Sequence, residues 1–179
     1  AKKSLVRMIN SQNNERIFFA DKVVLVEGIS DRLAFASLVE AFSARFSNYQ
    51  AIEIVEVGGK YNFEGYRVLL KALATPCFIV ADRDYLQSVG SDSVKSLFTF
   101  DEKKAGAALT QDKKSTDAGE LFRSLEVARK IGSMDGLESI LAHIKNRHKT
   151  FKRDLTPTEE EALSENLALL RSSQTFVLR

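Results

Sequence analysis

The stretch VVLVEGISD, residues 23–31, decides how the first part of the chain is interpreted. A run rich in β-branched apolar residues that stops at a glycine is typical of a strand buried inside a parallel sheet. Glu27 follows this run directly, and Asp31 comes four residues later, where the next segment begins. An acid in the first turn of a helix is favoured by the helix dipole. The stretch alone therefore fits either a strand with an ordinary helix start or one half of a metal site.

The segments that follow repeat the pattern of strand and then helix. After residue 31, apolar side chains recur at helical spacing and predict an amphipathic helix. AIEIVEVGG, residues 51–59, predicts a second strand, and NFEGYRVLLKALA, residues 62–74, predicts a helix that Pro76 ends. CFIVADRD, residues 77–84, predicts a third strand that turns abruptly acidic. This order predicts an α/β fold with a Rossmann-like parallel sheet.

The character of the sequence changes after residue 90, where helical spacing replaces the strand patterns. Thr156, Pro157 and Glu159 form a helix start with a capping box, and only TFVLR at the end predicts another strand. We therefore expect a helical insertion within the α/β fold. The predicted parts are a lead-in segment at 1–20, an α/β core at 21–91, a helical insertion at 92–172 and the start of a further core strand at 173–179.

Composition excludes several classes of protein. The 179 residues are 44% hydrophobic and 28% charged, which is typical of a globular domain, and the net charge of +2 does not by itself indicate a nucleic-acid partner. Cys77 is the single cysteine, so neither an internal disulfide nor a cysteine zinc cluster can form. We expect a reducing, cytoplasmic location and no membrane partner, because no apolar run reaches the roughly 18 residues of a membrane span. The sequence contains no Walker phosphate loop, so we do not expect this chain to bind ATP.

Acidic side chains follow two of the predicted strands. Asp82 and Asp84 form a D-x-D, and if strand pairing persists through them, both side chains lie on the same side. Because functional groups gather at the carboxyl ends of parallel strands, Glu27 and Asp31 are expected at the same edge. Carboxylates held close together repel one another unless a proton or a cation lies between them, and Mg²⁺ prefers oxygen ligands. The alternative is that the D-x-D only ends a strand and begins a solvated loop.

Three of these stretches together, VVLVEGISD, VEVGGKYNF and FIVADRD, resemble the Toprim domain that topoisomerases, bacterial primases and several nucleases share. The signature of that domain is a glutamate after the first strand and a D-x-D after the third, matched here by Glu27 and by Asp82 with Asp84. FFADKVVLVEGISD, with GGK after the second strand, is most similar to the overcoming lysogenization defect (OLD) family of nucleases. The resemblance covers residues 17–86, and the later helical part matches only as an insertion in the expected place.

This resemblance implies a DNA endonuclease that uses two Mg²⁺ or Mn²⁺ ions to nick or cut DNA. Glu27 and Asp31 would help to hold one ion, while Asp82 and Asp84 would hold or bridge to the second, and these four are the implied catalytic residues. In the family, an ATPase domain of the ABC type precedes the Toprim domain, so ATP is expected only in a domain absent from this chain. The family also implies a role in defence against phage and homo-oligomers formed through parts outside this chain.

Glycines and basic residues supply further candidate contacts. Gly58 and Gly59 would let the backbone approach the metal site or the DNA, although an ordinary strand-ending turn explains them equally well. Lys60 is a candidate phosphate contact or an ordinary surface lysine. HIKNRHKTFKR, residues 143–153, is either a solvated helix end or a segment that lies along DNA phosphates. Its candidate DNA-binding residues are Lys145, Arg147, Lys149, Lys152 and Arg153.

The family pattern is incomplete in this chain. A further acid and a catalytic lysine are expected after the fourth strand, yet the sequence stops at Arg179, where that strand begins, and starts with Ala1 rather than methionine. We therefore expect a fragment that is weakly active or inactive by itself. Three alternatives stay open: another Toprim enzyme such as a primase or an RNA-maturing nuclease, a non-catalytic Toprim module that binds nucleic acid or protein, and a phosphoacceptor receiver domain. Glu27 and the D-x-D fit the last of these poorly.

Overall fold

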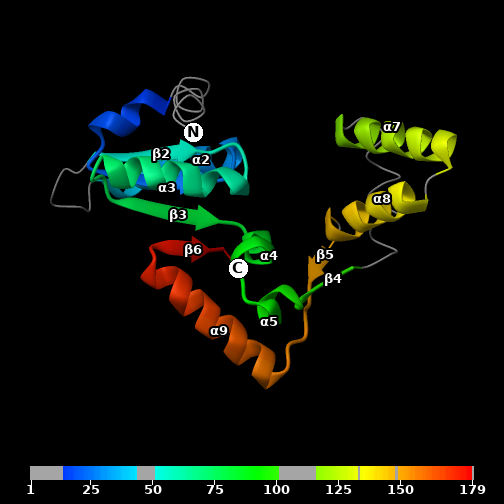
Figure 1. Cartoon of the computed structure of the whole chain (residues 1–179). Coiled ribbons are helices and arrows are strands. Elements are labelled where there is room, and N and C mark those ends of the chain that lie inside the picture. The colour runs from blue at the N-terminus through cyan, green and yellow to red at the C-terminus, as the bar shows by residue number, and fades with distance from the viewer. Residues whose placement is uncertain (1–13, 44–50, 101–115, 133, 148, 179) are drawn as a thin grey trace. The chain divides into compact units, whose positions relative to one another are not determined.

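The computed structural model describes residues 14–43, 51–100, 116–132, 134–147 and 149–178 (Figure 1). The chain divides into two units, the first comprising Ala1–Ser91 with Glu161–Arg179 and the second Asp92–Glu160. The predicted insertion at 92–172 begins where the second unit begins and extends to the end of a long helix, most of which belongs to the first unit. Among the described residues, every helix is too short or too polar to cross a membrane.

The first unit is built on a four-stranded parallel sheet with the strand order β2-β1-β3-β6. In this sheet Val26 lies opposite Glu56 of β2 and Val80 of β3, so the three strands end at the same level. The predicted α/β parallel sheet is confirmed, including the strand in TFVLR. The strands are β1 (Lys22–Val26), β2 (Ile52–Glu56), β3 (Cys77–Ala81) and β6 (Thr175–Val177).

Two helices connect the first three strands on opposite faces of the sheet. α2 (Ile29–Ser43) leads from β1 to β2, and α3 (Phe63–Ala72) leads from β2 to β3. Because β2 and β3 lie on either side of β1, right-handed crossovers require the two helices to cover opposite faces. Figure 1 accordingly draws α3 in front of the sheet and α2 behind it.

The hydrophobic core of the first unit lies between the sheet and α3. Leu25 and Ile79, which point to the same face of their strands, are buried together with Phe63, Tyr66 and Leu70 of α3. The opposite face is covered less completely. None of the described side chains of α2 at positions 29–42 is buried. The prediction of a helix from the apolar spacing of α2 is confirmed. Its apolar side chains nevertheless stay largely exposed.

Short elements complete the edges of the first unit. They are η1 (Asn14–Phe19), η2 (Lys60–Asn62), η3 (Arg83–Tyr85) and α4 (Leu86–Val89). α9 (Pro157–Ser172) leads into β6, and its Asn166 accepts a hydrogen bond from the backbone N–H of Ser91 at 3.3 Å. This contact connects α9 to the loop that follows α4.

The second unit contains a small antiparallel sheet that the sequence patterns did not predict. β4 and β5 pair across it, and the rings of Phe98 and Phe151 meet edge to face with centroids 5.2 Å apart. The expectation of helices alone was wrong here, because strands of three residues are too short to produce a recognisable alternation. The elements are α5 (Asp92–Lys95), β4 (Phe98–Phe100), α7 (Thr116–Ile131), α8 (Met134–Arg147) and β5 (Lys149–Phe151).

The predicted capping box at the start of α9 is confirmed. The helix begins at Pro157, and the Thr156 N–H donates to Glu159 Oε2 at 2.8 Å while the Glu159 N–H donates to Thr156 Oγ1 at 3.4 Å. Lys152 Nζ also donates to both Glu159 oxygens at 3.0 Å. The hydrogen bond from the Thr156 backbone, followed by that from Lys152, lowers the pKa of Glu159 below its ordinary value.

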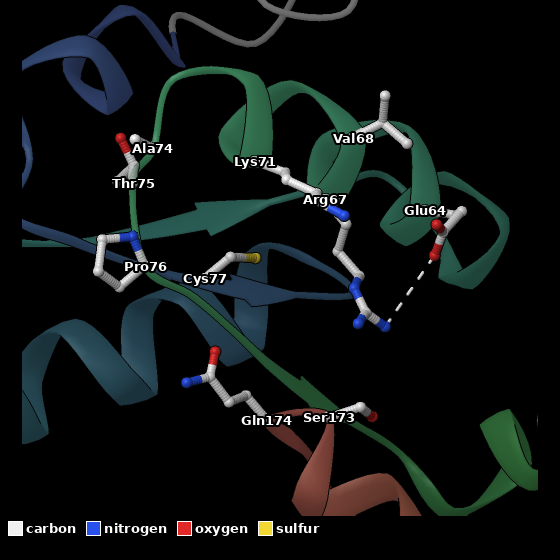
Figure 2. A pocket seen from close by; sticks show the side chains of 10 residues that line it. All are labelled: Glu64, Arg67, Val68, Lys71, Ala74, Thr75, Pro76, Cys77, Ser173 and Gln174. Atoms are coloured by element: carbon white, nitrogen blue, oxygen red, sulfur yellow. Dashed lines mark ion pairs between the residues drawn. The ribbon is translucent and has the colours of Figure 1, made fainter.

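A pocket of about 600 Å³ opens where β3 begins, at the opposite end of the sheet from the D-x-D (Figure 2). α3 contributes Glu64, Arg67 and Lys71 to its wall, and Cys77 and Gln174 line its other side. Arg67 and Glu64 lie 4.0 Å apart across one end of the pocket. Burial, which outweighs the opposing charge of Arg67, raises the pKa of the Cys77 thiol from 9.0 to about 11.

This pKa gives a prediction for the chemistry of Cys77. We expect its rate of alkylation by iodoacetamide to keep rising between pH 9 and 10.5, because only the thiolate reacts and the folded thiol ionises near pH 11. In urea, where the thiol regains its ordinary pKa of 9.0, the same cysteine should reach half of its maximal rate near pH 9 and level off at about pH 10. The chain has a single cysteine, so mass spectrometry follows this one site without ambiguity. A folded-state rate that levels off near pH 9 would contradict the assigned burial.

Candidate functional site

The carboxyl ends of β1 and β2 are held together by backbone hydrogen bonds that continue past the strands. The Val57 N–H donates to Val26 O at 2.9 Å, and the Gly59 N–H donates to Glu27 O at 3.1 Å. Glu27 is therefore fixed at the top of β1, beside the turn that follows β2. This position places a carboxylate directly above the buried core residues of the central strand.

The Glu27 side chain is only partly accessible to solvent, and one of its oxygen atoms lacks a partner. Oε2 is buried without a hydrogen bond. Burial is the main cause that raises the pKa of Glu27, and the negative charge of Asp84 acts in the same direction. The ammonium of Lys60 opposes both effects. A buried carboxylate oxygen without a partner destabilises the metal-free fold, so a cation at this position would relieve a real cost.

The D-x-D lies at the same edge, but not in the geometry that strand pairing would have imposed. β3 ends at Ala81, Asp82 has extended backbone with ψ 161°, and Asp84 lies in the turn η3. The expected alternation of a strand therefore does not apply to this pair. The two carboxylates are nevertheless close enough to interact. Burial is the main cause that raises the pKa of Asp82, and the negative charges of Asp31 and Asp84 raise it further.

Asp31 accepts a hydrogen bond from the Gly28 backbone N–H at 3.2 Å, in the first turn of α2. Its ordinary role as an acid at a helix start is thus present in the structure. After burial, the negative charge of Asp31 is the next cause that raises the pKa of Asp82, the residue that follows β3. Asp31 therefore serves the helix start and lies at the acidic edge at the same time. The sequence patterns had offered these two roles as alternatives.

Lys60 enters the acidic edge from the turn after β2. Its Nζ lies 2.7 Å from Asp84 Oδ2, and its side chain is 17% exposed. Lys60 is thus neither a solvated surface lysine nor a group directed away from the acids. The other oxygen of Asp84, Oδ1, is buried without a hydrogen-bond partner.

The four acids fit a divalent metal in their chemistry, although they do not form a complete ligand set as they lie. Within the described residues, no group of three or more His, Cys, Asp or Glu side chains is arranged to hold an ion. However, two buried carboxylate oxygens, Glu27 Oε2 and Asp84 Oδ1, have no partner. Hard oxygen donors of this kind suit Mg²⁺ and Mn²⁺. Asp31 and Asp84 are each bound by a group of the protein instead.

The glycine pair after β2 has a conformational role. Gly58 and Gly59 have φ angles of 68° and 118°, which residues with side chains rarely adopt. A Cβ at Gly59 would meet nothing within 4 Å, so the backbone angle rather than a close contact requires glycine there. Asn62 holds the same turn, because its Nδ2 donates to Val57 O at 2.8 Å. This supports a tight turn, which directs Lys60 toward the acids.

Two contacts that sequence patterns could not reveal fix η3. The rings of Phe63 and Tyr85 meet edge to face, with centroids 5.3 Å apart, and connect η3 to the start of α3. The Tyr85 N–H donates to Asp82 O at 3.0 Å. Both acids of the D-x-D therefore lie on a turn that is packed against the core.

The candidate DNA-binding residues of the second unit lie on α8, on β5 and directly after β5. Lys145 is exposed near the end of α8, Lys149 begins β5, and Arg153 is exposed after it. Lys152 is bound by Glu159. The side chain of Arg147 lies outside the described residues. The structure does not place this segment relative to the acidic edge, because it belongs to the other unit.

Comparison with known families agrees with this architecture. Residues 18–84 match the family model described as "Overcoming lysogenization defect protein-like, TOPRIM domain". No curated protein sequence and no solved structure gives a significant match to the chain. The matched segment runs from the end of η1 through β1, β2 and β3 to the second aspartate of the D-x-D. Residues 18–84 are therefore a Toprim domain of the OLD-like family.

Proposed function

We propose that this chain is the metal-binding region of a DNA endonuclease that hydrolyses phosphodiester bonds with the help of Mg²⁺ or Mn²⁺. The family match supports a role in nucleic-acid processing, and the carboxylates at the acidic edge support metal-dependent chemistry within that role. The observation that carries the proposal is that Glu27 Oε2 and Asp84 Oδ1 are buried and have no hydrogen-bond partner among the described residues.

Each acid has a defined part in the proposed site. Glu27 and Asp84 offer their unpartnered oxygens as ligands. Asp82 adds a carboxylate whose pKa is raised first by burial and then by the negative charges of Asp31 and Asp84. Asp31 would join by exchanging its hydrogen bond from Gly28 for a bond to the metal or to a metal-bound water. When bound, divalent ions supply an activated water and stabilise negative charge on the phosphate.

The direct test is metal binding by the whole chain. We expect Asp82→Asn and Glu27→Gln each to weaken Mn²⁺ binding by about tenfold or more, since loss of even an outer contact of a metal site costs about 10–100-fold in affinity. Isothermal calorimetry or the electron paramagnetic resonance signal of free Mn²⁺ measures the affinity directly.

Glu165→Gln is the matched control for this experiment. Glu165 is an exposed carboxylate on α9, in the same unit, and its neutralisation removes the same charge without touching the acidic edge. We expect its Mn²⁺ affinity to equal that of the wild type. If the control loses as much affinity as Asp82→Asn, the binding is diffuse charge attraction and the proposed site is wrong.

The proposed partner is DNA, with part of the contact made by the basic residues of the second unit. Lys149 and Lys152 stand three positions apart. Among the described residues, Lys152 alone of the two has a carboxylate partner, with both Glu159 oxygens 3.0 Å from its Nζ. Phosphate contacts release counterions and make binding depend on salt. Lys152 is already neutralised, so it should contribute less than its neighbour.

We therefore expect Lys149→Gln to weaken binding to duplex DNA and to reduce the magnitude of the slope of log K against log salt by about one. Lys152→Gln should have the smaller effect, because its charge is already balanced by Glu159. Fluorescence anisotropy at several salt concentrations measures both. No effect of either substitution would remove this segment from the DNA contact. Equal effects would show that the pair with Glu159 does not lower the contribution of Lys152.

A non-catalytic Toprim module that binds nucleic acid is the second candidate function, favoured by the lack of a complete ligand set in the described residues. The two candidates differ in the metal experiment. A catalytic region loses its Mn²⁺ affinity with Glu27→Gln, whereas a module without metal chemistry has no Mn²⁺ affinity to lose.

A further inference from the structure

The position of Lys60 within the acidic edge has a consequence for the order in which metal ions bind. We propose that the ammonium of Lys60 occupies the place of one divalent ion in the metal-free protein, so that a second ion binds only after Lys60 leaves Asp84. This inference rests on the proposed metal site and adds to it an internal competitor for the ion.

The contacts of Lys60 are those of a bound cation rather than of a surface lysine. Its Nζ lies 2.7 Å from Asp84 Oδ2 and 3.5 Å from the Asp84 backbone oxygen. The side chain is 17% exposed, whereas that of Asp84 is 49% exposed. The lysine is therefore the more enclosed partner, and its stem packs inside the edge. Such an ion pair is more strongly held than one between two solvated side chains.

Lys60 also acts on Glu27, the second acid with an unpartnered oxygen. Burial raises the pKa of Glu27, and the positive charge of Lys60 opposes that rise. The same residue thus connects the acid that follows β1 with the acid in η3. A divalent ion bridging the two carboxylates would satisfy the same charges, which is why the two cations compete.

Asp84 divides its two oxygens between these roles. Oδ2 is engaged by Lys60, and Oδ1 is buried without a partner. Asp84 Oδ1 and Glu27 Oε2 would stay available to one ion while the lysine remains on Oδ2. A second ion needs further oxygen from Asp84 and meets a positive charge that is already there. The geometry accordingly predicts one stronger and one weaker binding event.

The loop that carries Lys60 gives the ammonium a fixed place from which to compete. Gly59 has the φ angle of 118° that turns the chain, and Asn62 binds Val57 O from within the same turn. The side chain of Lys60 is a flexible four-carbon stem, so the ammonium can move away from Asp84 without unfolding the turn. While it contacts Asp84, Lys60 Nζ also lies 6.0 Å from the ring centroid of the exposed Tyr61, at the outer limit of a cation–π contact.

The test counts Mn²⁺ ions bound by the whole chain and measures the affinity of each. We expect the wild type to bind one ion tightly and a second at least about tenfold more weakly, a spread of the size that single contacts around a metal produce. Lys60→Met keeps the length of the side chain but removes the charge. It should strengthen binding of the second ion by about tenfold, so that both ions bind in one concentration range.

Two further variants separate charge from position. Lys60→Arg keeps the positive charge and should keep the wild-type pattern of one strong and one weak ion. Lys71→Met removes the same charge from an exposed lysine at the other end of the α3 region, beside the pocket, and should also leave the pattern unchanged. If Lys71→Met strengthens the second ion as much as Lys60→Met does, general electrostatics explains the effect and the inference is wrong.

A measurement on the unaltered chain makes the test independent of whether Lys60→Met folds. The ¹³Cε resonance of Lys60, assigned by its absence in Lys60→Arg, should change little with the first equivalent of Mg²⁺ and shift with the second. A shift that is complete at the first equivalent, or two ions of equal affinity in the wild type and in Lys60→Met, overturns the inference while leaving the metal site intact. Absence of any Mn²⁺ or Mg²⁺ binding in all variants instead overturns the proposed function.

Discussion

The parallel register of the three central strands is the constraint on which the acidic edge depends. Val26 lies opposite both Glu56 and Val80, so β1, β2 and β3 end at one level and their following loops meet. A shift of one residue in either pairing would move the acids after the strands by about 3.3 Å and reverse the faces of the strand residues. The same register buries Leu25 and Ile79 under α3. Packing of the core and position of the acids therefore come from a single arrangement.

The stability of the metal-free domain depends on how the charges at this edge are balanced. Four carboxylates gather there, and burial together with their mutual repulsion raises the pKa of Glu27 and of Asp82. Lys60 and the Gly28 N–H each bind one of the remaining acids. These internal partners lower the electrostatic cost without removing it, because Glu27 Oε2 and Asp84 Oδ1 are left without hydrogen bonds. These two oxygens are the ones that the proposed metal site would use.

Much of the fold could be predicted from the sequence because its signals are local. The β-branched runs before Glu27 and Asp82 and the helix-ending Pro76 each reflect the chemistry of a few adjacent residues, and the structure has the corresponding elements. The small sheet of β4 and β5 was not predicted, because its signal is not local. Each strand has three residues, and what identifies them is the pairing of Phe98 with Phe151, which are far apart in the sequence.

The candidate site likewise has features that follow from local sequence signals and features that depend on long-range contacts. That acids after β1 and β3 would share an edge follows from parallel topology, and the pKa shifts agree with it. How those acids are engaged depends on contacts between segments that no spacing rule encodes. The pairing of Lys60 with Asp84 joins residues 24 positions apart through two separate turns. In the sequence, a glycine pair followed by a lysine indicates only a turn and a positive charge directly after it.

The Lys60 pair also accounts for the lack of a complete ligand set among the described acids. Carboxylates that were already arranged around an absent ion would repel one another strongly in a partly buried setting. A protein can reduce that repulsion by protonation, by separating the acids or by supplying a cation of its own. Here the turn after β2 supplies the cation, and Asp84 turns one oxygen toward it. In the proposed site, a divalent ion would take over the charge balance that Lys60 now provides, so the position of Lys60 and the arrangement of the acids depend on each other.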